Sequence, residues 1–252
     1  MRPVILLDLD GVVWLSHQPI AGSVDAVAAL RAAGHRVVFV TNNSAPRLTA
    51  HEAALAAIGI AAAGDVVTSA MAAAFLVQAG ERVLVAGGEG VAEAVEARGA
   101  TVVENGDCDA VLVGVHRHFD YAGLRRAATA IMNGARLIGT NDDATYPTPD
   151  GAIPGGGAIL AAVRVASGTL GEVAGKPHDP MVRIVRSMIG DAAVAAAVMV
   201  GDRPETDGLF ARALGCRYAH VESGVTPAGT LVSPTPDIVA ADLATVASSL
   251  LA

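Results

Sequence analysis

Short apolar segments alternate along this chain with longer segments in which apolar residues recur at helical spacing. Residues 4–9 form an apolar run that ends at Asp10, a pattern typical of a strand buried on both faces. Repetition of this alternation predicts an α/β fold, with a parallel sheet that is covered by helices on both faces. Further strands are predicted over residues 36–40, 83–86, 110–115, 136–140, 194–200 and 216–221. Helices are predicted over residues 23–33, 49–58, 68–79, 89–98, 120–132, 155–168, 180–189, 206–214 and 240–251.

The pattern falls into three blocks, and the third block resumes the first. The simplest arrangement is one α/β core that is interrupted by an inserted α/β domain. We expect the core to comprise residues 1–79 and 170–252, and the inserted domain to comprise residues 80–169. Residues 141–151 are so rich in Asp, Pro and Gly that they are predicted to form a loop.

Composition and charge narrow the class of protein. Of the 252 residues, 52% are hydrophobic but only 3% are aromatic, and the formal net charge is −8. This acidic balance disfavours nucleic acid and anionic membranes as partners, because both attract clustered Lys and Arg. The sequence contains no apolar run long enough to span a bilayer, and its start lacks the pattern of a signal peptide. Cys108 and Cys216 lack metal-site spacing and are predicted to be free thiols in a reducing cytoplasm, with a disulfide as the alternative.

Polar residues stand where the predicted core strands end. In open α/β sheets, ligands bind beyond the carboxyl ends of the strands, so one crevice is expected to gather these residues. Two aspartates after a strand are also common as helix caps or turn formers, which is the alternative for each pair taken alone. The residues at these positions are Asp8, Asp10, Thr41, Asn42, Asn43, Lys176, Asp202 and Asp207.

This set of residue types describes a recognisable chemical task. Clustered carboxylates repel one another unless a cation neutralises them, and hard oxygen ligands favour Mg²⁺. A carboxylate can act as a covalent nucleophile on phosphorus, while Lys and Thr can bind phosphoryl oxygens. Lys176 is the only lysine beside 16 arginines, which indicates a position that needs an ammonium group. Gly11 is expected to let backbone N–H groups turn toward an anion.

Four segments, in their order and spacing, resemble the four motifs of the haloacid dehalogenase-like superfamily. The Thr-Asn-Asn form, the insertion, and the Asp-Ala-Thr-Tyr-Pro segment resemble subfamily IIA, which includes NagD-type nucleotidases and p-nitrophenyl phosphatases. The resemblance covers nearly the whole chain and implies a Rossmann-like parallel-sheet core with an inserted C2-type α/β cap. The four segments are Asp8-Leu9-Asp10-Gly11-Val12, Thr41-Asn42-Asn43, Gly175-Lys176-Pro177 and Gly201-Asp202-Arg203-Pro204-Glu205-Thr206-Asp207.

The resemblance also implies roles for individual residues. Asp8 would be the nucleophile, and Asp10 the general acid and then the general base. Thr41 and Lys176 would bind phosphoryl oxygens. The resemblance further implies that Asp8, the backbone carbonyl of Asp10 and Asp202 bind Mg²⁺, and that Asp207 reaches the ion through water or orients its ligands. Substrate-binding residues would be Thr41, Asn42, Asn43 and Lys176 from the core, and Asn141, Asp143, Tyr146 and Pro147 from the cap.

The function expected from these residues is Mg²⁺-dependent hydrolysis of a small phosphomonoester through an aspartyl-phosphate. Asp10 favours phosphoester hydrolysis over dehalogenation, since an alkoxide leaving group needs a proton. A phosphotransferase on the same fold is the main alternative, followed by a phospho-accepting signalling module and a non-catalytic binding protein. Relatives often pair through the cap, so a homodimer is expected. His116 and His118 have no assigned role, and the physiological substrate is not defined by the motifs.

Overall fold

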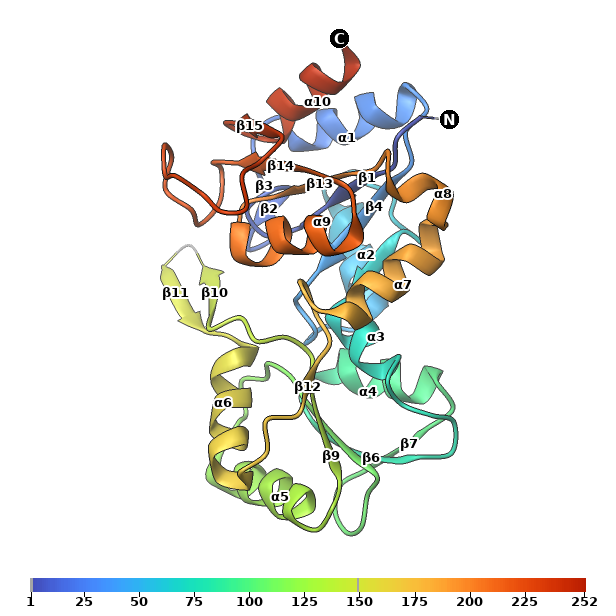
Figure 1. Cartoon of the computed structure of the whole chain (residues 1–252), viewed down its shortest axis with the longest axis vertical. Coiled ribbons are helices and arrows are strands. Elements are labelled where there is room, and N and C mark those ends of the chain that lie inside the picture. The colour runs from blue at the N-terminus through green and yellow to red at the C-terminus, as the bar shows by residue number, and fades with distance from the viewer. Residues whose placement is uncertain (1, 149) are drawn as a thin grey trace.

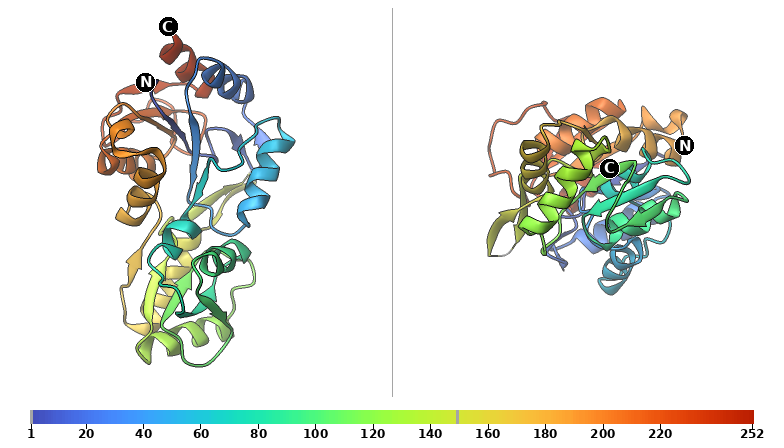
Figure 2. Two further views of the ribbon diagram at one scale, coloured as in Figure 1. Left: turned by 90° about the vertical axis from the view of Figure 1, so that its right-hand side faces the viewer. Right: turned by 90° about the horizontal axis from the view of Figure 1, so that it is seen from below.

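The computed structural model describes residues 2–148 and 150–252, so Met1 and Pro149 of the predicted core and loop lie outside the described residues. Two parallel sheets lie one above the other along the longest axis of the molecule (Figure 1). Helices α1 (Ser23–Ala32) and α10 (Leu243–Leu251) pack together at the end away from the second sheet (Figure 2). The predicted α/β class with parallel sheets is therefore confirmed.

The first sheet has six parallel strands, with β1 at its centre. Its alternate residues face opposite sides, since Ile5 and Leu7 pack against α1, α2 (Leu48–Ala57) and α10, whereas Leu6 faces the other helices. Those other helices are α3 (Ser69–Ala74), α7 (Asp179–Ile189) and α9 (Leu209–Leu214). In sheet order the strands are β15 (Ile238–Ala240), β14 (Arg217–Val221), β13 (Val198–Gly201), β1 (Ile5–Leu7), β4 (Val37–Thr41) and β5 (Val66–Thr68).

The second sheet has five parallel strands and its own hydrophobic core. One face packs against α5 (Tyr121–Met132) and α6 (Gly156–Ser167), and the other faces α4 (Glu89–Ala97). The alanines of α3 belong to one buried cluster that contains both Leu6 of the first sheet and Leu112 of the second. In sheet order the strands are β12 (Glu172–Val173), β9 (Arg136–Gly139), β8 (Ala110–Val113), β6 (Arg82–Ala86) and β7 (Thr101–Val103).

The predicted loop over residues 141–151 is wrong for residues 145–148 and 151, which lie in strands. Strands β10 (Thr145–Thr148) and β11 (Gly151–Pro154) pair there as an isolated antiparallel hairpin. Proline lacks a ladder N–H but is tolerated on an edge strand, and each strand of a two-stranded hairpin is an edge. Thr148 Oγ1 also donates a hydrogen bond of 2.6 Å to the Gly151 carbonyl, which closes the turn. The segment therefore forms a paired hairpin rather than an irregular loop.

The predicted helix over residues 68–79 is too long, because α3 starts at Ser69 and ends at Ala74. Val66–Thr68 is strand β5 at the edge of the first sheet, and helix α3 begins only at Ser69. The Thr68 hydroxyl accepts a hydrogen bond from the Met71 N–H and so caps α3. An edge strand of three residues is too short to show the alternation that identifies longer strands.

Other differences concern the boundaries of elements. The predicted strand over residues 194–200 begins only at Val198, after the short helix α8 (Asp191–Val194). The predicted helix over residues 206–214 starts as a π-helical turn, η1 (Pro204–Gly208), and continues as α9. The predicted helix from residue 240 begins at Leu243, because Ala240 ends β15. Strands β2 (Trp14–Leu15), β3 (Gln18–Pro19), β7 and β12 were not predicted.

Throughout the described ranges, each helix is too short or too polar to cross a bilayer.

Candidate active site

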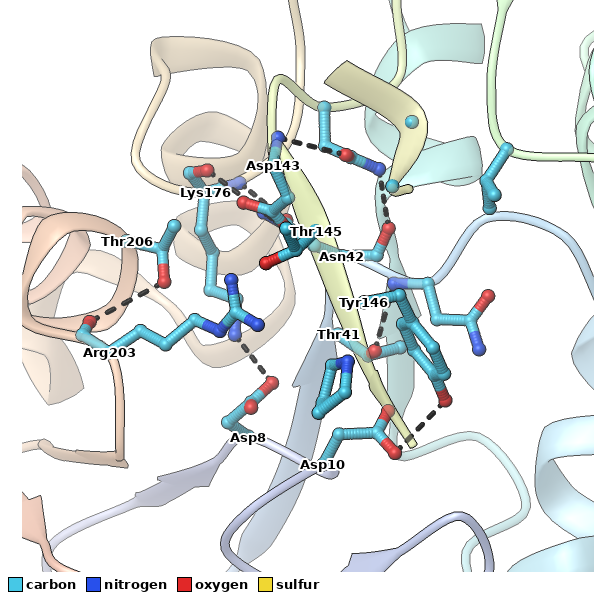
Figure 3. A pocket seen from close by; sticks show the side chains of 16 residues that line it. Asp8, Asp10, Thr41, Asn42, Asp143, Thr145, Tyr146, Lys176, Arg203 and Thr206 are labelled. Carbon is cyan, nitrogen blue, oxygen red and sulfur yellow. Dashed lines mark hydrogen bonds and ion pairs between the residues drawn. The ribbon is translucent and has the colours of Figure 1, made fainter. Parts of the chain in front are cut away.

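The candidate active site lies at the carboxyl ends of β1 and β4, where the hairpin β10–β11 reaches the first sheet (Figure 3). Every residue predicted for catalysis or substrate binding lines one cavity at this place. Two residues predicted only as metal ligands, Asp202 and Asp207, lie beside it with Asp8. The cavity is lined by Asp8, Asp10, Thr41, Asn42, Asn43, Val115, Asn141, Asp143, Thr145, Tyr146, Pro147, Gly155, Gly156, Lys176, Arg203 and Thr206.

Lys176 joins two of the acids. Its Nζ atom lies 2.7 Å from Asp8 Oδ1 and 2.7 Å from Asp207 Oδ1, and its side chain is only 2% exposed. Burial alone lowers the pKa of Lys176, but the charges of Asp207 and Asp8 outweigh it and hold the pKa above its usual value. Lys176 is therefore a charged ammonium group at the edge of the cavity.

Asp8, Asp202 and Asp207 form a compact group of carboxylates. One oxygen from each lies within 4.8 Å of the others, and all three side chains are buried. Burial raises the pKa of Asp8 well above its usual value, and burial together with Asp207 raises the pKa of Asp202 to about 7. Ionised carboxylates at such a place need a neighbouring cation beyond Lys176.

Asp202 supplies a direct test of whether a metal ion fits here. Its Oδ2 atom accepts a hydrogen bond of 2.7 Å from the Val225 N–H. Its Oδ1 atom is fully buried and finds no hydrogen-bond partner in the described part of the chain. A buried carboxylate oxygen without a partner is costly unless it binds a cation, and three oxygen donors suit Mg²⁺. The residues present therefore fit a magnesium ion.

Gly11 has a different role from the one expected. Its N–H donates a hydrogen bond of 2.8 Å to the Trp14 carbonyl, so this N–H does not face an anion. Gly11 instead has a φ of +93°, and a Cβ atom there would lie 2.6 Å from Asp202 Cγ. Glycine is thus required at this position because the Asp202 carboxylate occupies the space of a side chain.

Asp10 is separate from the three clustered acids. Its Oδ1 atom accepts a hydrogen bond of 3.0 Å from Tyr146 Oη, and Figure 3 shows this contact beside Asp8. Burial raises the pKa of Asp10, and the bond from Tyr146 partly offsets that effect. Two carboxylates that are two residues apart in sequence therefore have different neighbours and are suited to different tasks.

Thr41 and Asn43 present polar groups to the cavity from the end of β4. Thr41 Oγ1 accepts a hydrogen bond of 3.0 Å from the Asn43 N–H, so its hydroxyl proton is free to be donated to a ligand. Asn43 Oδ1 accepts a hydrogen bond of 3.2 Å from the Ala45 N–H, which shapes the turn after β4. This arrangement is suited to binding an anionic oxygen.

Asn42 and Asn141 have most of their hydrogen-bonding groups engaged within the protein. Asn42 Nδ2 donates to Asp143 Oδ2 at 3.1 Å and to the Lys176 carbonyl at 3.0 Å. Asn141 Nδ2 donates to the Asn42 carbonyl at 2.7 Å, and Asn141 Oδ1 accepts from the Asp143 N–H at 3.2 Å. The segment before the hairpin is thereby fastened to the first sheet, and both amides fit a structural role better than substrate contact.

The structure adds residues that were not predicted for this site, chiefly Arg203, Thr206 and Thr145. Figure 3 shows the Arg203 side chain extending into the cavity toward Lys176 and Asp143. Burial raises the pKa of Asp143, and the hydrogen bond from Asn42 and the positive charge of Arg203 partly offset that rise. Arg203 directly follows the predicted metal ligand Asp202 in the fourth motif. This position in the motif was the sequence signal that could have identified Arg203 as a residue of the site.

A second, larger cleft of about 1170 Å³ adjoins the cavity, and the two share Asn43, Val115 and Tyr146. The cleft is also lined by His116, Arg117, His118, His17 and Phe119. Burial, followed by the nearby His118, lowers the pKa of His116. Across residues 2–148 and 150–252, the three clustered aspartates are the one group arranged to hold a metal ion, so the histidines do not form such a site.

Known proteins of one family are similar to this chain. The model of the haloacid dehalogenase-like hydrolases matches residues 5–101, and a second model of the same kind matches residues 173–246. A D-glycerol 3-phosphate phosphatase of Mycobacterium tuberculosis is 38% identical over 242 residues, which are 92% of this chain and 66% of the relative. An acid sugar phosphatase of Staphylococcus saprophyticus is 33% identical over 225 residues, 88% of this chain and 86% of the relative.

Solved structures show the same likeness over nearly the whole chain. A p-nitrophenyl phosphatase from Archaeoglobus fulgidus has a TM-score of 0.91 at 26% identity, over 98% of this chain and 99% of that one. A glycerol phosphate phosphatase from Mycobacterium tuberculosis in complex with magnesium has a TM-score of 0.87 at 35% identity, over 97% of this chain and 76% of that one.

Proposed function

This chain belongs to the haloacid dehalogenase-like hydrolases, and we propose that it is a Mg²⁺-dependent phosphatase of a small phosphomonoester that works through a phosphorylated Asp8. The observation that carries this proposal is the buried contact of Lys176 with Asp8 and Asp207, beside the unpartnered Asp202 Oδ1. A nucleophilic carboxylate, a fixed cation and a free metal-binding oxygen thus meet at one point. The magnesium complex of a relative supports the choice of metal.

The first step forms a bond between a carboxylate oxygen of Asp8 and phosphorus. Asp8 Oδ1 is held by Lys176, which leaves Oδ2 to attack. As the ester P–O bond breaks, its electron pair passes to the leaving oxygen, which takes a proton from Asp10. Lys176 and the Thr41 hydroxyl bind the phosphoryl oxygens during this transfer. Asp8, the Asp10 carbonyl and Asp202 would hold Mg²⁺, with Asp207 orienting these ligands or reaching the ion through water, and the ion would supply charge that neutralises the carboxylates and polarises a phosphoryl oxygen.

The second step returns the enzyme to its starting state. Asp10, now ionised, takes a proton from a water molecule as that water attacks phosphorus, and the bond from Asp8 to phosphorus breaks. Inorganic phosphate leaves, and both aspartates regain their original protonation states. Asn43, Tyr146, Pro147 and Asp143 line the path beside the reacting atoms and define the substrate site.

Two parts of the chain have different tasks in the proposed reaction. Residues 80–169 act as a cap over a core of residues 1–79 and 170–252, and the cap excludes water from the site. The adjoining cleft receives the part of the substrate that leaves with oxygen, since it shares Asn43 and Tyr146 with the cavity. The partner is a small phosphorylated metabolite rather than nucleic acid or a membrane, in keeping with the net charge of −8.

We place the enzyme in the cytoplasm as a homodimer formed through the cap. Cys108 and Cys216 are both free thiols, which supports a reducing compartment. Gel filtration with light scattering tests the dimer, and fractionation of the source cells tests the compartment.

The test of the activity compares hydrolysis of p-nitrophenyl phosphate with Mg²⁺, with EDTA, and by an Asp8→Asn variant. Loss of turnover in the second and third cases supports the proposal, and equal turnover in all three refutes it. Asp25→Asn is the matched control, because Asp25 is an exposed residue of α1 far from the site.

A further inference from the structure

Tyr146 and Asp10 are 136 residues apart in sequence, yet they meet in the cavity. Tyr146 belongs to strand β10, which comes directly after strand β9 of the second sheet in the chain. Asp10 comes after strand β1 of the first sheet. Tyr146 Oη donates its hydrogen bond to Asp10 Oδ1 at 3.0 Å. The two halves of the molecule therefore touch at the residue that is proposed to handle the proton.

We propose that Tyr146 is a positioning residue that fixes the Asp10 carboxyl group with its second oxygen, Oδ2, directed at the leaving group. This inference rests on the proposed function, in which Asp10 protonates that group. It gives the hairpin β10–β11 a task in the reaction, beyond forming a wall of the cavity.

The geometry around Asp10 supports this role. A carboxyl group turns easily about its last side-chain bond, because that rotation has broad minima. Tyr146 Oη holds Oδ1 at 3.0 Å, and the Trp14 side chain also interacts with this carboxyl group. Tyr146 and Asp10 both line the cavity, so the bond from Tyr146 sets the orientation of the carboxyl group at the place where a ligand would bind.

Tyr146 is suited to donate this bond throughout the reaction. Burial and the charge of Asp10 raise the pKa of Tyr146, so the hydroxyl keeps its proton. Strand β10 is paired with β11, with Tyr146 opposite Ile153, which fixes the backbone that carries the ring. A donor that is fixed in place orients an acceptor at little cost in entropy.

The need for the proton of Asp10 depends on the substrate. When the P–O bond breaks, a basic leaving oxygen needs the proton of Asp10 more than a weakly basic one does. Phenyl phosphate and p-nitrophenyl phosphate have similar shapes, but the phenolate oxygen is much more basic than the nitrophenolate oxygen. A loss of orientation at Asp10 should therefore slow the first ester more than the second.

The experiment compares Tyr146→Phe with the wild type on both esters, using kcat/KM because it reports the step that cleaves the ester bond. We expect a loss of about tenfold for phenyl phosphate, the scale of one hydrogen bond, and a loss of less than about twofold for p-nitrophenyl phosphate. Phenylalanine keeps the ring and removes only the hydroxyl. Tyr121→Phe is the matched control, because Tyr121 is 80% exposed on α5.

An equal loss for both esters would overturn the proposal in favour of direct substrate contact, and an unchanged kcat/KM for both would overturn it outright.

Asp10→Asn separates this inference from the proposed function. If Asp10→Asn shows the selective loss and Tyr146→Phe does not, only the role of Tyr146 fails. If Asp10→Asn slows both esters equally, the assignment of Asp10 fails first. Adding Tyr146→Phe to Asp10→Asn should cause no further loss, since the group it orients is gone.

Discussion

The side chain of Asn42 binds both backbone polar groups of Lys176. Asn42 Oδ1 accepts from the Lys176 N–H at 2.8 Å, and Asn42 Nδ2 donates to the Lys176 carbonyl at 3.0 Å. Both residues are buried, and they are 134 positions apart in sequence. The end of β4 thereby sets the position of the lysine that contacts Asp8.

Replacing Asn42 by Ala should therefore damage both stability and activity. Two backbone groups of Lys176 would lose their partners in a buried place, at a cost of about 2 kcal/mol in the free energy of unfolding. Urea denaturation measures this cost, and kcat for p-nitrophenyl phosphate should fall with it. Asn133→Ala is the control, because Asn133 is exposed after α5. Full stability of Asn42→Ala would show that these bonds contribute nothing.

Replacing Lys176 by Arg should abolish most of the activity although the charge is kept. The Lys176 ammonium group reaches two carboxylates in a space where its side chain is 2% exposed, and a planar guanidinium group is larger. We expect kcat to fall by about 100-fold or more, the scale for loss of one fixed electrostatic contact at the reacting group. Steady-state kinetics measures the loss, and near-normal turnover would contradict the role given to the ammonium group.

Magnesium should stabilise the protein in the absence of substrate. Binding to the folded state alone adds about 2.7 kcal/mol when the ion is at 100 times its Kd, which raises the Tm of a chain of this size by roughly 5–10 °C. Differential scanning fluorimetry with and without Mg²⁺ measures this shift. Asp202→Asn should remove the shift, because it changes the buried oxygen that has no protein partner. A shift that persists in Asp202→Asn would place the ion elsewhere.

Asp237 should make the protein more stable at neutral pH than in acid. A hydrogen bond from the Tyr218 N–H, together with Arg212, holds the pKa of Asp237 below its usual value. The folded state therefore favours the ionised form, and this contribution is present above the unfolded pKa near 4 and is lost as pH falls through the lower folded pKa.

The Asp237→Asn variant isolates that contribution. Its unfolding free energy at pH 7 should be lower than that of the wild type by about 1 kcal/mol, since the carboxylate is 36% exposed and screened by solvent. The difference between the two proteins should shrink as pH falls below about 4. Urea denaturation at several pH values measures it, and a difference that grows in acid would contradict the sign.

Much of the fold could be predicted because long buried strands and alanine-rich helices carry their periodicity locally. Residues 37–41 and 23–32 agree with the predicted elements to within a residue or two. Strand β5 has only three residues, and the hairpin β10–β11 is rich in Pro and Gly. Neither segment therefore has the hydrophobic periodicity by which a strand is predicted from sequence. Their structure depends on neighbours that are distant in sequence.

The same contrast holds for the candidate site. Asp8, Asp10 and Lys176 could be identified because each stands at a strand end or in a matching motif. The contact between Tyr146 and Asp10 could not, because the sequence contains no signal for which residue of a long insertion returns to the core. Arg203 was missed for a different reason, since its place beside Asp202 was noted but the direction of its side chain depends on η1.

The central claim is that Asp8 becomes phosphorylated, and chemical trapping tests it most directly. The enzyme, with Mg²⁺, is mixed with p-nitrophenyl phosphate, quenched in acid within the first turnover and reduced with borohydride, which converts an aspartyl-phosphate to homoserine. Mass spectrometry of the peptide that contains residues 8 and 10 then locates the change. We predict homoserine at position 8 in the wild type, and none in Asp8→Asn or without substrate. Homoserine at position 10, or turnover without homoserine at any residue, would contradict the account.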